Sequence, residues 1–169
     1  MLVKQGQKAP HFALPDENGK MRTLSDARGS WLLLYFYPKD DTTGCTQEAC
    51  SIRDDIPQFE KLDCVVYGVS ADSEESHRKF REKYHLPFHL LSDPRKETLK
   101  EYGVWGKKKF MGREYDGIFR TSFLIDPAGK IAKVYEKVKP LMHVEEVLQD
   151  LDTLQHGKKE TQRKKSAGR

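Results

Sequence analysis

Uninterrupted apolar stretches alternate along the chain with stretches in which apolar residues recur at helical spacing. Residues 31–37 form an apolar run that ends at Pro38, and residues 64–70 form a second run. Runs of this length are typical of strands that are buried on both faces of a sheet. We expect both to be central strands, with a shorter strand at residues 89–92.

Hairpins are predicted on both sides of this central part. Residues 12–14 and 21–24 flank the dipeptide Asn18–Gly19, which suits a tight turn. Residues 121–126 and 130–135 flank a second turn with the sequence Asp-Pro-Ala-Gly. The first hairpin precedes the central strands, and the second follows them.

Four helices are expected: one from about Cys45, one up to about Tyr84, one over residues 95–102, and one along the apolar stripe from Val144 to Leu154. Asp72 is the expected N-cap of the second helix, with Glu75 reaching back to it. Residues 104–119 show no clear period and are expected to form an irregular functional loop. The order predicts an α/β fold with a mixed central sheet, helices on both faces and an N-terminal β-hairpin.

The composition fits a single globular domain. Of 169 residues, 37% are hydrophobic and 33% are charged. The longest apolar run has seven residues, whereas a membrane-spanning helix needs about 20. The first residues also lack the apolar segment of a signal peptide. We expect one domain over residues 1–156, located in the cytoplasm and making no membrane contact.

Positive charge gathers at the C-terminus. The formal net charge is +4, but residues 157–169 alone carry +5, which leaves −1 for residues 1–156. The basic segment has no aromatic residues between its charges, so we predict a disordered, solvated tail and no nucleic-acid partner. Binding of nucleic acid or an anionic surface through this tail is the alternative from another functional class.

The chain has three cysteines, an odd number and too few for the disulfide framework of a secreted protein. Cys45 follows a polar loop and Gly44 where a helix is expected to begin. The partial positive charge of a helix N-terminus stabilises a thiolate, which is a nucleophile. The alternative is a small buried apolar residue. Cys64 lies inside a strand-like run and is expected to belong to the core.

Cys50 lies five residues after Cys45. An ideal helix separates the two Cα atoms by about 8.6 Å, whereas a disulfide needs them within about 7 Å. Either the two thiols are unrelated or the helix unwinds during a redox cycle. A pair with this spacing points its sulfurs apart, and the six histidines are scattered along the chain, so no metal site is expected.

The segment Pro38-Lys-Asp-Asp-Thr42-Thr-Gly-Cys45 resembles the Pro-x3-Thr-x2-Cys motif of peroxiredoxins. The position of Cys50 resembles the Q-type branch, the bacterioferritin-comigratory-protein-like enzymes. The resemblance extends over residues 3–155 and implies a thioredoxin-like peroxiredoxin fold. The chain differs at Thr43, where many relatives carry proline, which changes the stiffness of the loop.

The resemblance also implies roles for individual residues. Cys45 would be the peroxidatic cysteine, and Cys50 would resolve its sulfenic acid as an intramolecular disulfide. Thr42 would bind the thiolate and the peroxide, and Arg120 would stabilise the thiolate and polarise the O–O bond. Pro38 would shield the pocket from water. The implied substrate-binding set is Pro38, Thr42, Gly44 and Arg120. Glu48, one turn after Cys45, could tune this pocket or merely face solvent.

The implied reaction is a thiol-specific peroxidase reaction that protects against oxidants. It would reduce hydrogen peroxide and organic hydroperoxides without a metal or organic cofactor. Thioredoxin would recycle the enzyme, with glutaredoxin as a second candidate reductant, and a monomer would suffice. The rival within enzymes is a thiol–disulfide oxidoreductase that uses the same pair, Cys45 and Cys50, without consuming peroxide.

Overall fold

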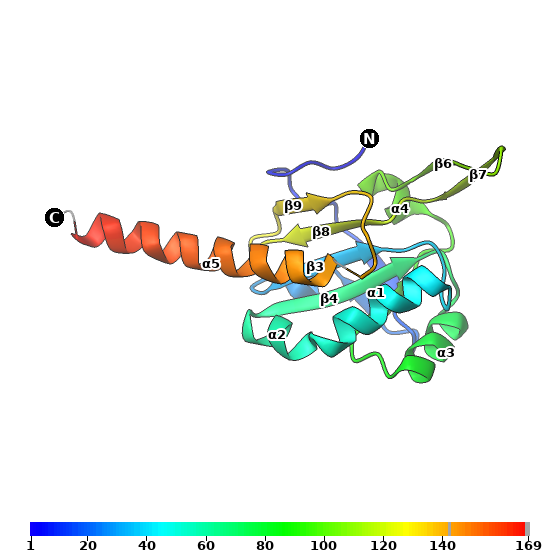
Figure 1. Cartoon of the computed structure of the whole chain (residues 1–169), viewed down its shortest axis with the longest axis horizontal. Helices are drawn as coiled ribbons and strands as arrows, with labels where there is room; N and C mark the ends of the chain where they lie inside the picture. Colours follow the sequence, from blue (N-terminus) through cyan, green and yellow to red (C-terminus); the bar gives the residue numbers. More distant parts are fainter. Residues whose placement is uncertain (142, 168–169) are drawn as a thin grey trace.

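A single five-stranded sheet forms the centre of the molecule (Figure 1). The structure is a computed structural model that describes residues 1–141 and 143–167, with side chains as far as Gly157. The strand order is β5-β4-β3-β8-β9, with bounds β3 Trp31–Phe36, β4 Cys64–Ser70, β5 His89–Ser92, β8 Thr121–Ile125 and β9 Ile131–Tyr135. β3, β4 and β5 pair in parallel, whereas β8 is antiparallel to both β3 and β9. The predicted mixed sheet is confirmed.

β3 is the central strand, and all six of its residues are buried. Leu32, Leu34 and Phe36 point into the core on one face of the sheet. Leu33 and Tyr35 point into the core on the other face. A strand buried on both faces explains the uninterrupted apolar run in the sequence.

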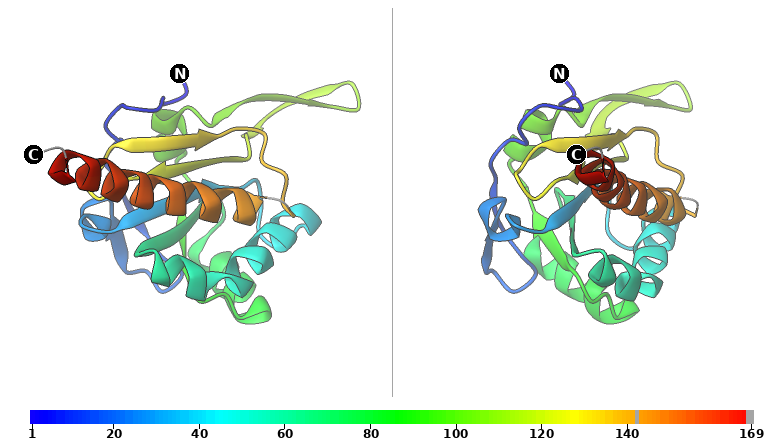
Figure 2. Two further views of the ribbon diagram at one scale, coloured as in Figure 1. Left: turned by 60° about the vertical axis from the view of Figure 1, so that its left-hand side comes forward. Right: turned by 90° about the vertical axis from the view of Figure 1, so that its left-hand side faces the viewer.

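Helices cover both faces, as predicted (Figures 1 and 2). One face carries α1 Thr43–Asp54, α2 Ile56–Lys61, α3 Glu74–Tyr84 and the beginning of α5 His143–Ala167. The other face carries α4 Glu97–Tyr102, the short helix η1 Ser25–Ala27, and the N-terminal hairpin of β1 Ala13–Pro15 and β2 Met21–Thr23. A short connection after Phe36 leads from the end of β3 to the start of α1 at Thr43.

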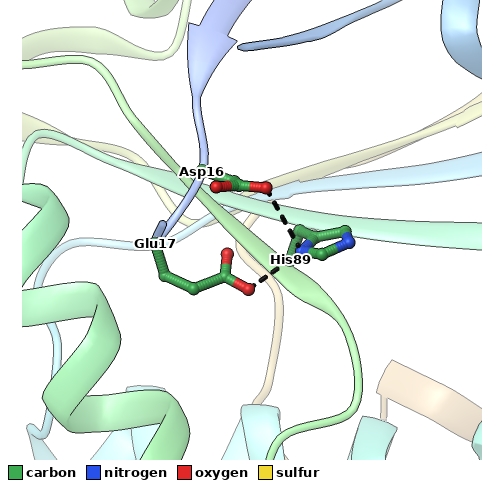
Figure 3. Close-up of side chains that lie close together, drawn as sticks. All are labelled: Asp16, Glu17 and His89. Atoms are coloured by element: carbon green, nitrogen blue, oxygen red, sulfur yellow. Dashed lines mark hydrogen bonds and ion pairs between the residues drawn. The ribbon is translucent and has the colours of Figure 1, made fainter. Parts of the chain in front are cut away.

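The turn of the N-terminal hairpin is fixed to β5 by buried acidic side chains (Figure 3). His89 Nδ1 lies 2.9 Å from Glu17 Oε1 and 3.6 Å from Asp16 Oδ2. Arg22 pairs with Asp16, and Arg81 pairs with Glu17. The contacts hold the hairpin against the sheet.

The prediction of an irregular loop at residues 104–119 is wrong. β6 Trp105–Phe110 and β7 Arg113–Ile118 form an antiparallel hairpin that projects from the sheet (Figure 1). Met111 and Gly112 both have positive φ at its tip, which is the geometry of a tight two-residue turn. Most of its residues are exposed or half-buried. Because neither face of the hairpin is buried along its length, the sequence carries no alternation of apolar and polar residues.

The predicted N-cap of the helix at residues 74–84 is also wrong. Ser73 occupies this position, and its side chain accepts a hydrogen bond from the Ser76 backbone N–H. The Asp72 carboxylate instead accepts from the Ser70 hydroxyl and the Asp40 N–H. Serine and aspartate cap helices about equally well. Tertiary contacts therefore determine which of the adjacent residues Asp72 and Ser73 becomes the N-cap.

The basic C-terminal segment was predicted to be disordered, but α5 continues through Gly157 to Ala167. Lysine, arginine, glutamate and glutamine favour helices, and one interior glycine costs only about 1 kcal/mol. The helix extends past the sheet (Figures 1 and 2). The domain boundary at residue 156 stays a prediction. Over the described residues, no helix has the length and apolar character needed to cross a membrane.

Candidate active site

The sheet brings two distant segments to one edge. Phe36 at the end of β3 pairs with Thr121 at the start of β8. Because the two strands are antiparallel, the connection after β3 and the residue before β8 lie at the same edge. The α1 helix begins there, and Arg120 directly precedes β8.

Cys45 lies in the first turn of α1, and only 2% of its surface is exposed. Its Sγ accepts a hydrogen bond from Arg120 Nη2 over 3.2 Å. The thiol is free. A cationic donor and the positive end of the helix both stabilise a thiolate at this position. The structure brings Arg120 and Cys45 into contact, and the roles that the resemblance implies for them stay predictions.

Arg120 also binds a buried acid. Its Nη1 lies 2.9 Å from Oε1 of Glu48, which is fully buried. Burial raises the pKa of Glu48 to about 7, although Arg120 acts to lower it. Glu48 is therefore buried against Arg120 and does not face solvent, which was one of the two alternatives for this residue. Among the described side chains, Glu48 Oε2 and the Tyr35 hydroxyl are buried polar atoms without a hydrogen-bond partner.

Gly44 lets the guanidinium approach the helix. A Cβ atom at this position would lie 3.1 Å from Arg120 Nη2 and 3.5 Å from Pro140 Cγ. The first of these distances is closer than ordinary van der Waals contact between such atoms. The missing side chain therefore makes room for the bond between Arg120 and Cys45.

Thr42 is the N-cap residue of α1, and its backbone oxygen accepts from Thr46 N–H over 2.8 Å. Its hydroxyl donates to the backbone oxygen of Lys39 over 3.0 Å. The resemblance implied a bond from this hydroxyl to Cys45, and such a bond requires the hydroxyl to leave Lys39. Pro38 is half-buried and lies two residues after the end of β3.

The other two cysteines occupy different surroundings. Cys50 is half-buried on the same unbroken helix as Cys45, and it is a free thiol. Cys64 is buried at the start of β4, as predicted, and burial raises its pKa to about 12. Cys64 is therefore a poor nucleophile at neutral pH.

Two side-chain clusters in the described residues offer the atom types that bind metals: Asp16, Glu17 and His89, and Asp40, Asp72 and His77. Both are already linked by hydrogen bonds, and arginines neutralise the first cluster. Neither cluster contains a cysteine. The expectation of no metal stays a prediction.

No motif in the sequence predicts the second cluster. Asp40 lies inside the motif at residues 38–45, but the motif gives it no role. His77 lies three residues before Phe80, and both are buried on α3. The one signal in the sequence is the spacing of His77 and Phe80, which places the histidine on the buried face of the helix.

A mixed sheet that presents a buried, arginine-bound thiol at a helix N-terminus defines a thiol-dependent oxidoreductase. The comparisons with known proteins make this class specific. The AhpC/TSA family matches residues 5–134. Peroxiredoxin Bcp of Bacillus subtilis (strain 168) is 49% identical over 151 residues, which cover 89% of this chain and 96% of that protein. Peroxiredoxin Bcp of Escherichia coli (strain K12) is 46% identical over 146 residues, covering 86% and 94%.

Solved structures that resemble this chain are also peroxiredoxins. A cysteine-to-serine mutant of PrxQ from Xylella fastidiosa has a TM-score of 0.86 at 36% identity, over 90% of this chain and 98% of that one. The bacterioferritin comigratory protein of Xanthomonas campestris, described for its alkyl peroxide reduction activity, has a TM-score of 0.80 at 35% identity, over 84% and 90%. The chain belongs to the AhpC/TSA family, as a peroxiredoxin of the Bcp and PrxQ type. It is a peroxidase, and its fold is thioredoxin-like, as the resemblance implied.

Proposed function

We propose that this peroxidase attacks hydroperoxides with Cys45, resolves the product with Cys50 and draws electrons from an external dithiol. The observation that carries the proposal is the 3.2 Å hydrogen bond between Arg120 and the buried Cys45 thiol. A positioned cation stabilises both the thiolate and the negative charge that leaves the O–O bond.

In the first step, the Cys45 thiolate attacks the terminal oxygen of the hydroperoxide. The O–O bond breaks, and its electron pair leaves on the alkoxide or hydroxide, which takes up one proton to form an alcohol or water. Cys45 becomes a sulfenic acid. Arg120 is charged throughout, so it offers hydrogen bonds and does not supply this proton.

In the second step, the Cys50 thiol condenses with the Cys45 sulfenic acid. A disulfide forms, and one water molecule leaves. Both residues lie on the intact α1 helix, where ideal geometry keeps their Cα atoms about 8.6 Å apart. The first turns of α1 therefore unwind before the bond closes.

The remaining residues form the peroxide pocket. Gly44 directly precedes Cys45 and leaves room for the guanidinium, and Pro38 shields the thiol from water in the proposed pocket. The Thr42 hydroxyl turns from Lys39 towards Cys45 when peroxide binds. Both hydrogen peroxide and organic hydroperoxides are substrates, and the alkyl peroxide reduction described for the Xanthomonas protein supports the organic class.

In the third step, an external dithiol reduces the disulfide. We propose thioredoxin, with glutaredoxin as a second candidate. The cycle needs no cofactor because sulfur carries the electrons, and it needs no second copy of the chain because both thiols are in one helix. A reducing cytoplasm fits the three free thiols.

The test is to treat the reduced protein with one equivalent of hydrogen peroxide and map its thiols by non-reducing peptide mass spectrometry. A linkage between Cys45 and Cys50 supports both assignments. A stable sulfenic or sulfinic Cys45 beside a free Cys50 would remove the resolving role. If peroxide is consumed while Cys45 stays unmodified, the assignment of Cys45 as the nucleophile is wrong.

Two rival functions are tested separately. A thiol–disulfide oxidoreductase activity beside the peroxidase activity would reduce protein disulfides without peroxide, so an assay of disulfide reduction in the absence of peroxide measures it. Binding of an anionic polymer by residues 157–169 would weaken steeply with salt and disappear when those residues are removed.

A further inference from the structure

The connection between β3 and α1 is fixed to α3 by a buried group of hydrogen bonds, here called the Asp40 anchor. It consists of Asp40, Tyr37, Asp72, Ser76 and His77. The Asp40 carboxylate accepts from the Tyr37 hydroxyl over 2.6 Å and from the Ser76 hydroxyl over 2.8 Å. The Asp40 backbone N–H donates to Asp72 over 2.8 Å. Asp40 is 7% exposed although it lies in a loop.

His77 is the rigid part of the anchor. It is fully buried on α3. Its Nδ1 lies 2.7 Å from Asp40 Oδ2, and its Nε2 lies 3.0 Å from the backbone oxygen of Leu91 on β5. One ring nitrogen faces the loop and the other faces β5, so the imidazole bridges the loop and the central sheet.

The next residue is held by the C-terminal end of the same helix. Asp41 has φ +56, a conformation that side chains rarely adopt. Its carboxylate accepts from Lys83 Nζ over 2.8 Å and from the Tyr84 hydroxyl over 2.7 Å. These contacts hold an unfavourable backbone conformation one residue before Thr42, the N-cap of α1.

The anchored residues directly precede the segment that must unwind. Thr42 is the N-cap of α1, and Cys45 lies in the first turn of the helix. The side-chain contacts of Asp40 and Asp41 go to α3, and Asp40 also contacts Tyr37 after β3 and Asp72 before α3. None of these partners lies on α1, which carries both reacting thiols. The anchor can therefore stay closed while α1 unwinds, and it fixes the end from which α1 forms again.

We propose that Asp40 and His77 are positioning residues that favour the folded first turn of α1, in which Cys45 faces Arg120. This inference rests on the proposed cycle, in which the folded turn reacts with peroxide and the unwound turn forms the disulfide. Loosening the anchor shifts the balance towards the unwound turn. The first oxidation becomes slower, and the condensation of Cys45 with Cys50 becomes faster. Faster condensation leaves less sulfenic acid for a second peroxide to convert to sulfinic acid.

The opposite movement of two rates is the readout, because general destabilisation does not produce it. We would prepare Asp40→Asn and His77→Gln and follow sulfenic acid and disulfide formation by rapid quenching and mass spectrometry. The matched control is Glu17→Gln, which disturbs a buried carboxylate–histidine pair of the same kind, with 2.9 Å between Glu17 Oε1 and His89 Nδ1 (Figure 3). That pair joins the N-terminal hairpin to β5, and Glu17 also binds Arg81 on α3. Among the described residues, no hydrogen bond or ion pair of Glu17 reaches the connection between β3 and α1.

We expect both anchor variants to slow the first oxidation about tenfold, since small displacements of a reacting group have effects of at least this size. Disulfide formation should be several times faster, and the sulfinic fraction at high peroxide should fall. Glu17→Gln should leave the ratio of the two rates unchanged.

Unchanged rates in the anchor variants, or two rates lowered in parallel, would overturn the proposal. The wild-type protein separates this failure from failure of the proposed cycle. If wild type forms no bond between Cys45 and Cys50, the resolving step fails. In that case the rate of the first oxidation alone tests the positioning role of the Asp40 anchor. This rate must be lower in Asp40→Asn than in Glu17→Gln.

Discussion

Arg120 donates a hydrogen bond from Nη2 to the Sγ of Cys45 over 3.2 Å, although 75 positions separate the two residues in the sequence. The pairing of β3 with β8 creates this contact. The guanidinium also binds Glu48, so one cation serves a thiol and a buried carboxyl group.

Replacing Arg120 by lysine keeps the charge but removes the fork that reaches Cys45 and Glu48 together. We expect the rate of peroxide reduction at low peroxide to fall by about 10²-fold, as when one donor to a developing anion is lost. Stopped-flow oxidation of Cys45 measures this rate. Arg22→Lys, in the ion pair with Asp16 on the N-terminal hairpin, is the control. A rate near that of wild type in Arg120→Lys would contradict the role of the fork.

Gly44→Ala separates activity from stability. The new Cβ would press on Arg120 Nη2 at 3.1 Å, so we expect peroxide reduction to slow about tenfold. The fold should be as stable or up to about 1 kcal/mol more stable, because alanine favours a helix over glycine. Thermal unfolding and peroxide decay measure the two effects.

Gly157→Ala is the matched control for Gly44→Ala, since an added Cβ there meets nothing within 4 Å. It should leave peroxide reduction unchanged. Equal activity of the two alanine variants would mean that the space beside Arg120 has no part in catalysis.

Glu48 makes the stability of the fold depend on pH. Burial raises its pKa to about 7 from an ordinary 4.5, against the effect of Arg120. The folded protein therefore holds this proton more tightly than the unfolded chain. The resulting stabilisation is complete below about pH 4.5 and is lost as pH rises to about 7, by an amount on the order of 3 kcal/mol.

Glu48→Gln should remove this part of the pH dependence of the free energy of unfolding, measured by urea denaturation between pH 4.5 and 7.5. Glu75→Gln is the control, because Glu75 is exposed and forms a surface pair with Lys79. The prediction fails if wild type and Glu48→Gln lose stability with the same slope.

The three cysteines should behave differently. Cys45→Ser should abolish peroxide reduction. Cys50→Ser should keep the first oxidation but lose recycling by thioredoxin, measured as NADPH consumption in a coupled assay. Cys64→Ala should turn over normally, because that thiol is buried with a pKa of about 12. Normal steady-state turnover of Cys50→Ser would exclude it as the resolving residue.

The local patterns in the sequence were sufficient for most of the fold. The apolar run at residues 31–37 predicted the central strand, and the helix containing Cys45 was expected within two residues of its start at Thr43. The hairpin at residues 105–118 was missed, because an element that projects from the sheet buries no face and leaves no period. The choice of Ser73 over Asp72 as a cap depended on a contact with Asp40.

The sequence by itself determined the candidate nucleophile, its place at a helix N-terminus and, through the resemblance, the set of residues around it. Only the tertiary structure decided that Glu48 is buried against Arg120 and that Asp40 is held by His77, across 72 and 37 positions of the chain. Periodicity and motifs record the forces between near neighbours, such as helix capping and the alternation of buried faces. Contacts between distant residues arise when strands pair and helices pack, and no local pattern records which side chains will then meet.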